Sequence, residues 1–392
     1  MAKVIKLKRK EKPYAVRWKN GEKEVQEAFD TRAEAELFRS QKNIDTAKDR
    51  KRKRPRKTGE NPTFKAVAQS YLTVKEHPRR GDPIAPITLR VYESYLRERI
   101  YPAIGSVLIA NVSRQHFEEV YDTCVLAGFS RKTRKETLRL ITAVLKHAKA
   151  CDYITEVPSH DIDTSPTNKE KIRERMERDE KTYTPDEVYT MLAAADSLAQ
   201  DDKLQTRRVW ARYRPMLYFL VYTGTRISEA RGFPRKDFLP RDGVIKITQS
   251  APEKGDVGYV KTADAVRDIP LHPILEEVLK EWLGDHSRIL AFGTESDVPI
   301  CGSNLYSRML EPLKERADAL AESKSDPRFV RVSRNRAFHA FRHHYASRLV
   351  KKGANLKELQ TLMGHATAAI TLDTYAHLFE GDQRELVTTL VI

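Results

Sequence analysis

The segment 338–377 is the most informative stretch of this chain, and it reads FHAFRHHYASRLVKKGANLKELQTLMGHATAAITLDTYAH. His339 and Arg342 are three residues apart, so on a helix they share one face. A glycine, which permits a tight turn, immediately precedes His365, and Tyr375 follows ten residues later. Arginine, imidazole and phenol side chains together supply positive charge, proton carriers and a nucleophile. Phosphodiester chemistry without a metal needs these three elements.

The composition indicates a polyanionic partner. The chain has 392 residues, enough for two to four domains. Its net charge is +16 and its pI is about 9.5, which favours nucleic acid over a membrane surface. The alternative, that a basic chain is simply soluble, stays open on composition alone.

Cysteine usage and hydropathy indicate a cytoplasmic protein. Cys124, Cys151 and Cys301 are far apart and lack metal-type spacing, so we expect a reducing compartment and no zinc site. No apolar run approaches the ~20 residues of a membrane span. The first residues lack the apolar core of a signal peptide. We therefore expect no membrane association.

Residues 1–48 predict a small α+β domain with a three-stranded sheet and one helix. The strand patterns cover 4–8, 14–18 and 24–29. Asn20-Gly21 is a strong hairpin signal, and Thr31 with Glu34 forms a capping box that opens a helix. A basic sheet of this kind could lie in a DNA groove. A purely structural module is the alternative.

Residues 49–62 form a basic linker, in which Lys51, Arg52, Lys53 and Arg54 are consecutive. We expect these four side chains to contact DNA phosphates. A solvated tether is the ordinary alternative, and a nuclear localisation signal is a weaker one.

Residues 63–157 carry a helical hydrophobic period and predict an all-α domain. Its last helix is expected from residue 132 to 150. Four basic residues lie at the start of that helix and are expected on the DNA backbone: Arg131, Lys132, Arg134 and Lys135. A solvated helix face is an equally good interpretation of any one of them.

A second linker, 158–182, precedes a third domain, 183–392. Thr184 and Glu187 form a capping box around a proline at the first helical position, which marks the start of a new domain. The pattern predicts an apolar helix over 215–222 and further helices from residue 273 onward. Strands are expected at 244–248, 258–262 and 266–271. We therefore expect a mainly α domain with a small antiparallel sheet.

Two sites in this domain hold further candidate residues. Arg226 follows a glycine turn in an apolar setting, so it must be paired or face a ligand. Glu229 is either the ion-pair partner of Arg226 or a support behind it. Lys261 lies at the end of an expected strand, where its side chain could reach a bound backbone. Lys254 is its rival.

The histidines of the segment 338–377 could also indicate a metal site. His339 and His343 lack the intervening glutamate of the zinc proteases, and no carboxylate-rich loop accompanies them. We therefore expect no metal and no cofactor. Tyr375 taken alone would be an ordinary core or surface tyrosine, since its pKa near 10 makes it a poor nucleophile unless cations favour its ionised form.

The order of these residues resembles the signature of the tyrosine recombinases of the phage integrase family. The motifs are Arg226 in TGTRISE, Lys261 in KT, His339-x-x-Arg342-His343, Gly364-His365 and Tyr375. The match covers about residues 184–380. Met363 before the glycine, and Ala340-Phe341 in the histidine–arginine motif, depart from the commoner residues of the family.

The resemblance implies a role for each residue. Tyr375 would attack the scissile phosphate and leave a 3′-phosphotyrosine and a free 5′-hydroxyl. Arg226 and Arg342 would hold the non-bridging oxygens. Lys261 would protonate the leaving oxygen, and His339 would act as general base or acid. His365 would donate a hydrogen bond to the phosphate. Glu229 would occupy a supporting position.

The resemblance also implies the architecture and the partners. It assigns an arm-type DNA-binding domain, a core-binding domain and a catalytic domain of the DNA breaking-rejoining fold. The expected function is a site-specific integrase of a phage, prophage or mobile element, which acts on double-stranded attachment sites as a homo-tetramer. An accessory DNA-bending protein and an excisionase would be further partners. The alternatives are a type IB topoisomerase and a catalytically silent DNA-binding regulator.

Overall fold

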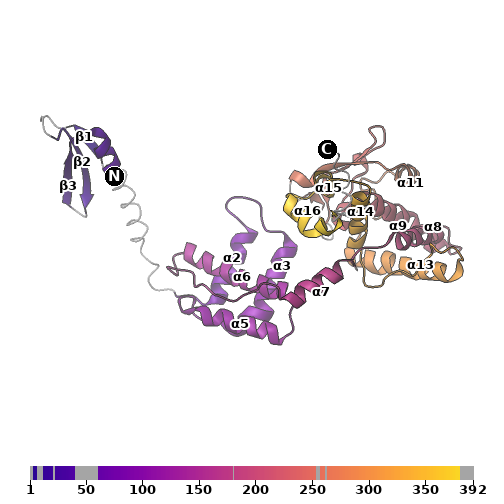
Figure 1. Cartoon of the computed structure of the whole chain (residues 1–392), viewed down its shortest axis with the longest axis horizontal. Coiled ribbons are helices and arrows are strands. Elements are labelled where there is room, and N and C mark those ends of the chain that lie inside the picture. The colour runs from indigo at the N-terminus through magenta and orange to yellow at the C-terminus, as the bar shows by residue number, and fades with distance from the viewer. Residues whose placement is uncertain are drawn as a thin grey trace, which may run out of the picture. The chain divides into compact units, whose positions relative to one another are not determined.

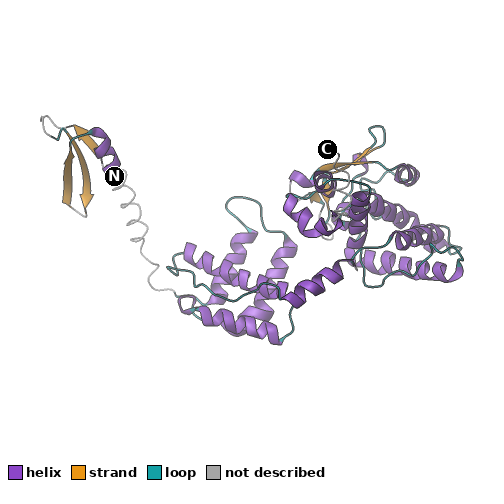
Figure 2. Cartoon of the chain, viewed as in Figure 1, coloured by secondary structure: helices purple, strands orange, loops and turns teal. Residues whose placement is uncertain are grey.

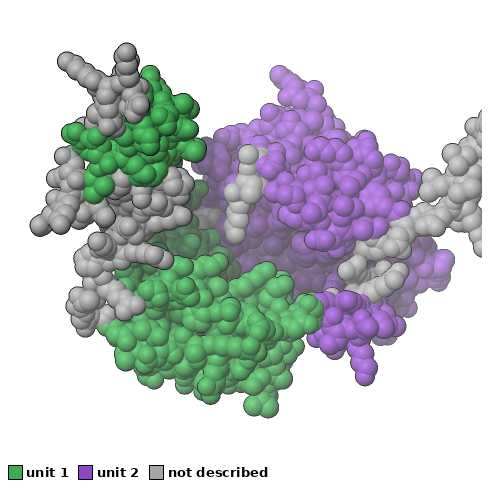
Figure 3. All heavy atoms as spheres, turned by 60° about the vertical axis from the view of Figure 1, so that its left-hand side comes forward, with its two compact units in different colours: residues 1–165 green, residues 166–392 purple. Residues whose placement is uncertain are grey.

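The computed structural model describes residues 3–6, 12–20, 23–39, 61–179, 181–252, 257–260 and 263–379. The chain divides into two compact units, residues 1–165 and 166–392, coloured separately in Figure 3. The boundary between them lies within the segment 158–182. Helices make up most of both units, and the strands are short (Figure 2).

A small antiparallel sheet opens the first unit. Its strands are β1 (Lys3–Lys6), β2 (Tyr14–Asn20) and β3 (Lys23–Phe29), in the order β1-β2-β3. A helix follows at residues 32–39. Its capping box is formed in both directions: the Glu34 amide donates to Thr31 Oγ1 at 3.3 Å, and the Thr31 amide donates to Glu34 Oε2 at 3.2 Å. Buried Val16 and Ala35 pack the helix against the sheet.

The rest of the first unit is helical. Its elements are α2 (Phe64–Glu76), α3 (Pro86–Tyr95), a π-turn η1 (Leu96–Ile100), α4 (Tyr101–Ile104), a 3₁₀ turn η2 (Ile109–Asn111), α5 (Arg114–Leu126) and α6 (Arg131–Ala150). Phe64, Val67 and Tyr71 recur at helical spacing on the buried face of α2, and Leu138, Ile141 and Leu145 do so on α6. The two faces meet in one hydrophobic core.

The second unit is built around three long helices that lie side by side in Figure 1: α8 (Pro185–Ala199), α9 (Leu204–Thr223) and α13 (Glu311–Ser323). The predicted capping box of α8 is present: the Glu187 amide donates to Thr184 Oγ1 at 3.1 Å, and the Thr184 amide donates to Glu187 Oε2 at 2.8 Å. Further helices of this unit are α7 (Asn168–Asp179), α10 (Ile227–Arg231), α11 (Pro273–Gly284), α12 (Gly302–Leu305) and the π-turn η5 (Tyr306–Leu310).

The predicted start of α9 at Pro215 is wrong, because the helix begins at Leu204 and continues through the proline. A proline inside a helix removes one backbone hydrogen bond. Trp210 and Tyr213 before it, and Met216 and Leu217 after it, are all buried in the core of the unit. This burial on both sides of the proline outweighs the missing hydrogen bond.

Within the described residues of the second unit, the strands form two small sheets rather than the one expected. β4 (Phe238–Leu239), β5 (Val244–Ile247) and β8 (Arg267–Pro270) are antiparallel in the order β4-β5-β8. β6 (Gln249–Ser250) pairs separately with β7 (Gly258–Tyr259). Short 3₁₀ turns, η3 (Arg235–Asp237) and η4 (Ala263–Ala265), precede β4 and β8.

Three helices complete the second unit and carry the informative segment of the sequence. They are α14 (His339–Lys351), α15 (Leu356–Met363) and α16 (Ala368–Tyr375), followed by the 3₁₀ turn η6 (Ala376–Phe379). α14 packs against α9 and α15, and α15 packs against α16 and β8. Within the described ranges, no helix combines the length and apolar character that crossing a bilayer requires.

Candidate active site

The turn between α9 and α10 brings the first arginine into place. Gly224 ends α9 in the left-handed conformation, with φ of 59°. A Cβ atom on Gly224 would lie 2.7 Å from Cγ of Tyr345, so the position needs glycine for both its conformation and its space. Arg226 then caps the N-terminus of α10. Its Nη1 donates to Glu229 Oε1 at 2.8 Å, and its side chain is 38% exposed.

Glu229 joins two arginines. Its carboxylate accepts from Arg226 as above, and Oε2 accepts from Nη2 of Arg267 at 2.8 Å. Burial alone would raise the pKa of Glu229, but the charge and hydrogen bonds of Arg267 lower it to about 2. The carboxylate is therefore ionised at neutral pH. Of the two predicted alternatives for Glu229, the geometry shows the ion pair with Arg226, and Arg267 in turn holds the carboxylate.

Arg342 is the most deeply buried arginine of the group, at 2% exposure. Its Nη1 donates to the carbonyl of Gly224 at 2.9 Å, and its Nη2 donates to the carbonyl of Met363 and to Nε2 of His365. It thereby connects the turn after α9 with the turn after α15. A guanidinium has five N–H bonds, and the contacts described for Arg342 use three of them. Burial and the charge of Arg226 lower the pKa of Arg342 to about 10, which still leaves it charged at neutral pH.

His365 lies in the turn between α15 and α16, where Gly364 has φ of 62°. Its Nε2 is 3.0 Å from Nη2 of Arg342, and its Nδ1 is 2.9 Å from Oγ1 of Thr371. Burial and the charges of Arg342 and Arg226 lower the pKa of His365 to about 4. The imidazole is therefore neutral at pH 7.

Tyr375, the last residue of α16, is buried beside two imidazoles. Its ring is nearly parallel to that of His365, at 12° and 6.2 Å between centroids. The ring of His343 meets it at 65° and 5.6 Å. Burial raises the pKa of Tyr375, and the charges of Arg342 and Arg226 offset this only in part. The phenol is protonated at neutral pH, so an attack by its oxygen needs a proton acceptor.

His339 is exposed at the N-terminal end of α14, and its ring contacts that of His343, with 4.7 Å between centroids. The pKa of His339 is lowered, first because neighbouring atoms partly desolvate its ring and second because the positive charges of Arg342 and Arg226 are near it. It is therefore neutral at pH 7 and can accept a proton. Of the two histidines, His343 has the ring adjacent to Tyr375.

These side chains leave excess positive charge at a hollow. Glu229 pairs directly with Arg226 and Arg267, and its charge also acts on the nearby guanidinium of Arg342. Arg226, Glu229 and His365 line a cavity of about 390 Å³ together with Gly364 and Ser228. Buried cations without enough counter-charge are costly. The hollow is therefore suited to an anion such as a phosphate.

Comparison with known proteins agrees with this geometry. A sequence profile described as "Phage integrase family" matches residues 181–381. The chain belongs to the phage integrase family. Its activity is that of a tyrosine-type site-specific recombinase.

Among relatives of this recombinase, a XerC-like tyrosine recombinase of Caldanaerobacter subterraneus is 25% identical over 337 residues, 78% of each chain. The integrase of Mycobacterium phage D29 is 22% identical over 319 residues, covering 79% of this chain and 75% of that protein.

Two solved structures share the fold of this recombinase. The Tn1549 transposon integrase in complex with a circular intermediate DNA has a TM-score of 0.60 at 21% identity, covering 83% of this chain and 99% of that chain. A lambda integrase dimer bound to a core site has a TM-score of 0.52 at 17% identity, covering 79% of this chain and 97% of that chain. They support the catalytic fold predicted for the third domain.

Several predicted site residues of the recombinase lie outside the described residues. These are Lys261, its rival Lys254, and the basic linker residues Lys51, Arg52, Lys53 and Arg54. The four basic residues of α6 are described and differ from one another. Lys132 is exposed, whereas Nη1 of Arg131 donates to the carbonyl of Thr164 and the Arg134 guanidinium lies 5.4 Å from the ring centroid of Tyr121. Lys135 is half-buried beside a hollow of about 300 Å³.

Arg267 and Thr371 contact the site but were not predicted as part of it. Arg267 had a signal in the sequence: in the strand β8 the buried positions alternate, and Arg267 is in phase with buried Ile269. A charged residue at an inward strand position requires a partner. Its partners are Glu229, the carbonyl of Leu362 at 2.8 Å from Nε, and the carbonyl of Ala265.

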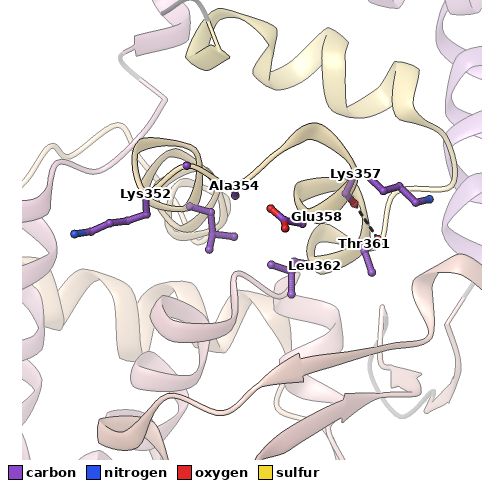
Figure 4. A pocket seen from close by; sticks show the side chains of 8 residues that line it. Lys352, Ala354, Lys357, Glu358, Thr361 and Leu362 are labelled. Atoms are coloured by element: carbon purple, nitrogen blue, oxygen red, sulfur yellow. Dashed lines mark hydrogen bonds between the residues drawn. The ribbon is translucent and has the colours of Figure 1, made fainter. Parts of the chain in front are cut away.

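A larger hollow of about 600 Å³ lies at the opposite end of α14 (Figure 4). It is formed by the end of α14, the turn after it and α15: Leu349, Lys352, Gly353, Ala354, Lys357, Glu358, Thr361 and Leu362. None of the predicted catalytic residues lines it, so it is separate from the reaction centre. In the part of the chain that the structure describes, no group of three or more His, Cys, Asp or Glu could hold a metal ion.

Proposed function

We propose that this recombinase cleaves and rejoins DNA through a covalent bond between Tyr375 and a DNA phosphate. The phenol oxygen attacks phosphorus, the bond from phosphorus to the 5′-oxygen breaks, and a 3′-phosphotyrosine remains. The phenol loses its proton to a base, and the leaving oxygen takes up a proton. A second DNA end reverses these steps, so no nucleotide cofactor or metal is consumed.

The cluster around Arg342 carries the proposal. Arg226 and buried Arg267 pair with the carboxylate of Glu229, and buried Arg342 is within reach of its charge. The Tyr375 ring is stacked against the His365 imidazole. A phosphorane carries more negative charge than the phosphate, so fixed cations stabilise it selectively. The charges of Arg342 and Arg226 also favour the ionised form of Tyr375. One set of cations therefore serves both the electrophile and the nucleophile.

The proposed roles follow the chemistry of each side chain. Arg226 and Arg342 hold the non-bridging oxygens, because guanidinium forks fit phosphate. His365 donates a hydrogen bond to the phosphate. His339 exchanges the proton of the phenol, and Glu229 holds Arg226 in place. Lys261, which lies outside the described residues, is proposed to protonate the leaving oxygen.

The wider proposal concerns the DNA and the assembly. Residues 1–48 are proposed as an arm-type domain, 49–62 as a linker, 63–157 as the core-binding domain, 158–182 as a second linker and 183–392 as the catalytic domain. Related proteins named as phage integrases and transposases support a role in integrating or excising a mobile element. The Tn1549 and lambda integrase structures hold DNA, and the lambda structure is a dimer, which supports DNA attachment sites as substrate.

A tetramer on DNA, an accessory DNA-bending protein, an excisionase and action in the cytoplasm complete this proposal. The apolar residues of the segment 378–392 predict that it packs either on a neighbouring subunit or back on its own domain. Its residues from 380 onward lie outside the described part of the chain.

Trapping the covalent adduct tests the chemistry. A duplex selected for binding from a random pool is nicked beside the cleavage position, so that the released fragment diffuses away and the adduct accumulates. Wild type is expected to form a protein–DNA adduct, while Tyr375→Phe binds the duplex and forms none. Tyr213→Phe is the matched control, because Tyr213 is also 2% exposed but lies in the core on α9. An adduct on Tyr375→Phe would remove this residue from the mechanism.

A second assay separates recombination from relaxation. Plasmids with two copies of the selected site are compared with supercoiled plasmid that lacks it. Recombinant products that depend on the paired sites are expected. Relaxation of both plasmids without recombinants would favour topoisomerase activity.

A further inference from the structure

Both ring nitrogens of His365 have partners inside the protein. Nε2 is 3.0 Å from Nη2 of Arg342, and Nδ1 is 2.9 Å from Oγ1 of Thr371. Thr371 is fully buried, on α16. The main chain of His365 is fixed on both sides by Gln360, whose carbonyl accepts from the His365 amide at 3.1 Å and whose Nε2 donates to the His365 carbonyl at 3.0 Å. The side-chain contacts therefore decide how the ring is turned.

The partner of Nε2 determines where the ring proton lies. A guanidinium can only donate hydrogen bonds, so Nε2 must accept from Arg342. The ring is neutral, since the pKa of His365 is lowered to about 4 by burial and by the charges of Arg342 and Arg226. A neutral imidazole carries one proton, which must then be on Nδ1. The hydroxyl of Thr371 accepts that proton's hydrogen bond.

This arrangement conflicts with the role proposed for His365 on DNA. To donate to a phosphate oxygen, Nε2 must carry the proton, and Nδ1 then needs a donor. A hydroxyl can serve in either direction, because it holds one proton and two lone pairs. Among the side-chain contacts described for His365, only Thr371 can accept in one state and donate in the other.

We propose that Thr371 is a positioning residue that serves both tautomers of His365: its hydroxyl accepts from Nδ1–H in the DNA-free protein, where Arg342 keeps the proton off Nε2, and donates to Nδ1 when a phosphate is bound. The exchange takes one proton from Nδ1 to water and returns one from water to Nε2, so the ring stays neutral. The DNA-bound half of this inference rests on the proposed function. The DNA-free half rests on the hydrogen-bond geometry of the ring together with its lowered pKa.

The position of Thr371 gives the contact a second consequence. Thr371 precedes Tyr375 by four residues, one helical turn, so the two side chains are on the same face of α16. The His365 and Tyr375 rings are 6.2 Å apart and nearly parallel. The hydrogen bond from Thr371 therefore fixes the imidazole relative to the helix that carries the proposed nucleophile.

Nitrogen NMR of the DNA-free protein tests the tautomer directly. Protein labelled with ¹⁵N-histidine is measured at pH 7, and the His365 signals are assigned by their loss in His365→Asn. Wild type is expected to show a protonated Nδ1 and an unprotonated Nε2. Thr371→Ser keeps the hydrogen bond of the Nδ1 proton, whereas Thr371→Val, of nearly the same shape but without the hydroxyl, removes its acceptor, so the Nδ1 proton signal should shift and exchange faster with water while Nε2 stays unprotonated. A protonated Nε2 in wild type, or an unchanged Nδ1 proton signal in Thr371→Val, overturns the inference.

Adduct formation on the nicked duplex then tests the functional half. At metal sites, losing the hydrogen bond that orients a ligating imidazole costs roughly 10- to 100-fold in activity. By analogy, Thr371→Val is expected to slow adduct formation about tenfold or more, and Thr371→Ser by less than about threefold. In a His365→Asn background, Thr371→Val should have no further effect, because it acts through the imidazole. An equal slowing in both backgrounds overturns the positioning role. If Tyr375 forms no adduct at all, the proposed function fails, and the NMR result still decides the tautomer.

Discussion

Arg267 and Glu229 form an ion pair inside the protein, with Nη2 2.8 Å from Oε2 and side chains that are only 2% and 3% exposed. The two residues are 38 positions apart, on β8 and α10. Nε of Arg267 also donates to the carbonyl of Leu362, just before the turn that carries His365. The pair thus joins the loop of Arg226 to the loop of His365. The distance between these two loops therefore depends on the pair.

Replacing Arg267 by Met should therefore destabilise the protein strongly. Breaking one partner of a buried pair leaves an uncompensated charge and costs about 3–5 kcal/mol. Urea unfolding measures the loss. Arg331→Ala is the matched control, because Arg331 pairs with Glu322 at 2.7 Å while the two side chains are 74% and 61% exposed. We expect that change to cost less than about 1 kcal/mol, and equal losses in the two variants would contradict the importance of the pair.

Gly224→Ala should disturb the turn that Arg342 holds. The added Cβ would lie 2.7 Å from Cγ of the Tyr345 ring, and φ at this position is +59°. Gly243→Ala separates the two effects, because Gly243 has φ of +68° but nothing within 4 Å of an added Cβ. We expect the control to lose about 1–2 kcal/mol from backbone strain alone and Gly224→Ala to lose clearly more, by urea unfolding. Similar losses would show that the Tyr345 ring adapts without cost.

Local signals in the sequence predicted part of the geometry around this site. The Thr184–Glu187 and Thr31–Glu34 capping boxes are formed as predicted, because each depends on residues three apart. The order of Arg226, Arg342, His365 and Tyr375 was sufficient to suggest one site, and the structure brings these four together.

Contacts between distant segments could not be predicted in this way. Arg267 meets Glu229 only because β8 pairs with β5 and carries the arginine inward, and no spacing rule connects positions 229 and 267. The start of α9 also could not be predicted locally, because Pro215 is typical of a helix start. The helix instead begins at Leu204, since Trp210 and Tyr213 are buried in the core of the unit. Thr371 resembled any helix threonine until the ring of His365 was placed beside it.

Stability should fall as the pH is lowered from about 7 toward 4. The pKa of His365 is lowered to about 4 by burial and neighbouring cations, and burial likewise lowers the pKa of His344. The unfolded chain has histidine pKa values near 6.5, so it binds more protons than the folded state between these values. The stabilisation is complete above pH ~6.5 and is lost as pH falls toward the folded pKa.

Urea unfolding at a series of pH values measures this effect. His365→Gln should flatten the dependence between pH 6.5 and 4, because the substituted group no longer titrates. The carboxylate of Glu229 stabilises the folded protein at neutral pH, because its pKa of about 2 lies below the value near 4.3 of an unfolded glutamate. It therefore adds to the pH dependence only below about pH 4.3, where this stabilisation is lost as the pH falls. A wild-type stability that is constant from pH 7 to pH 5 would contradict neutral, buried histidines.

Deleting residues 1–57 should weaken DNA binding and reduce its dependence on salt. This segment contains 20 of the 71 Lys and Arg residues. For every phosphate that the shortened protein no longer neutralises, the magnitude of the negative slope of log K against log salt should decrease by about 0.9. A second variant, in which Lys51, Arg52, Lys53 and Arg54 are changed to Gln, keeps the sheet domain and removes only linker charge. If the linker binds phosphates, these four substitutions are enough to reduce the slope of log K against log salt. If it is only a tether, the slope stays at the wild-type value while the deletion still lowers it, and an unchanged slope in both variants would exclude the whole segment from the DNA interface.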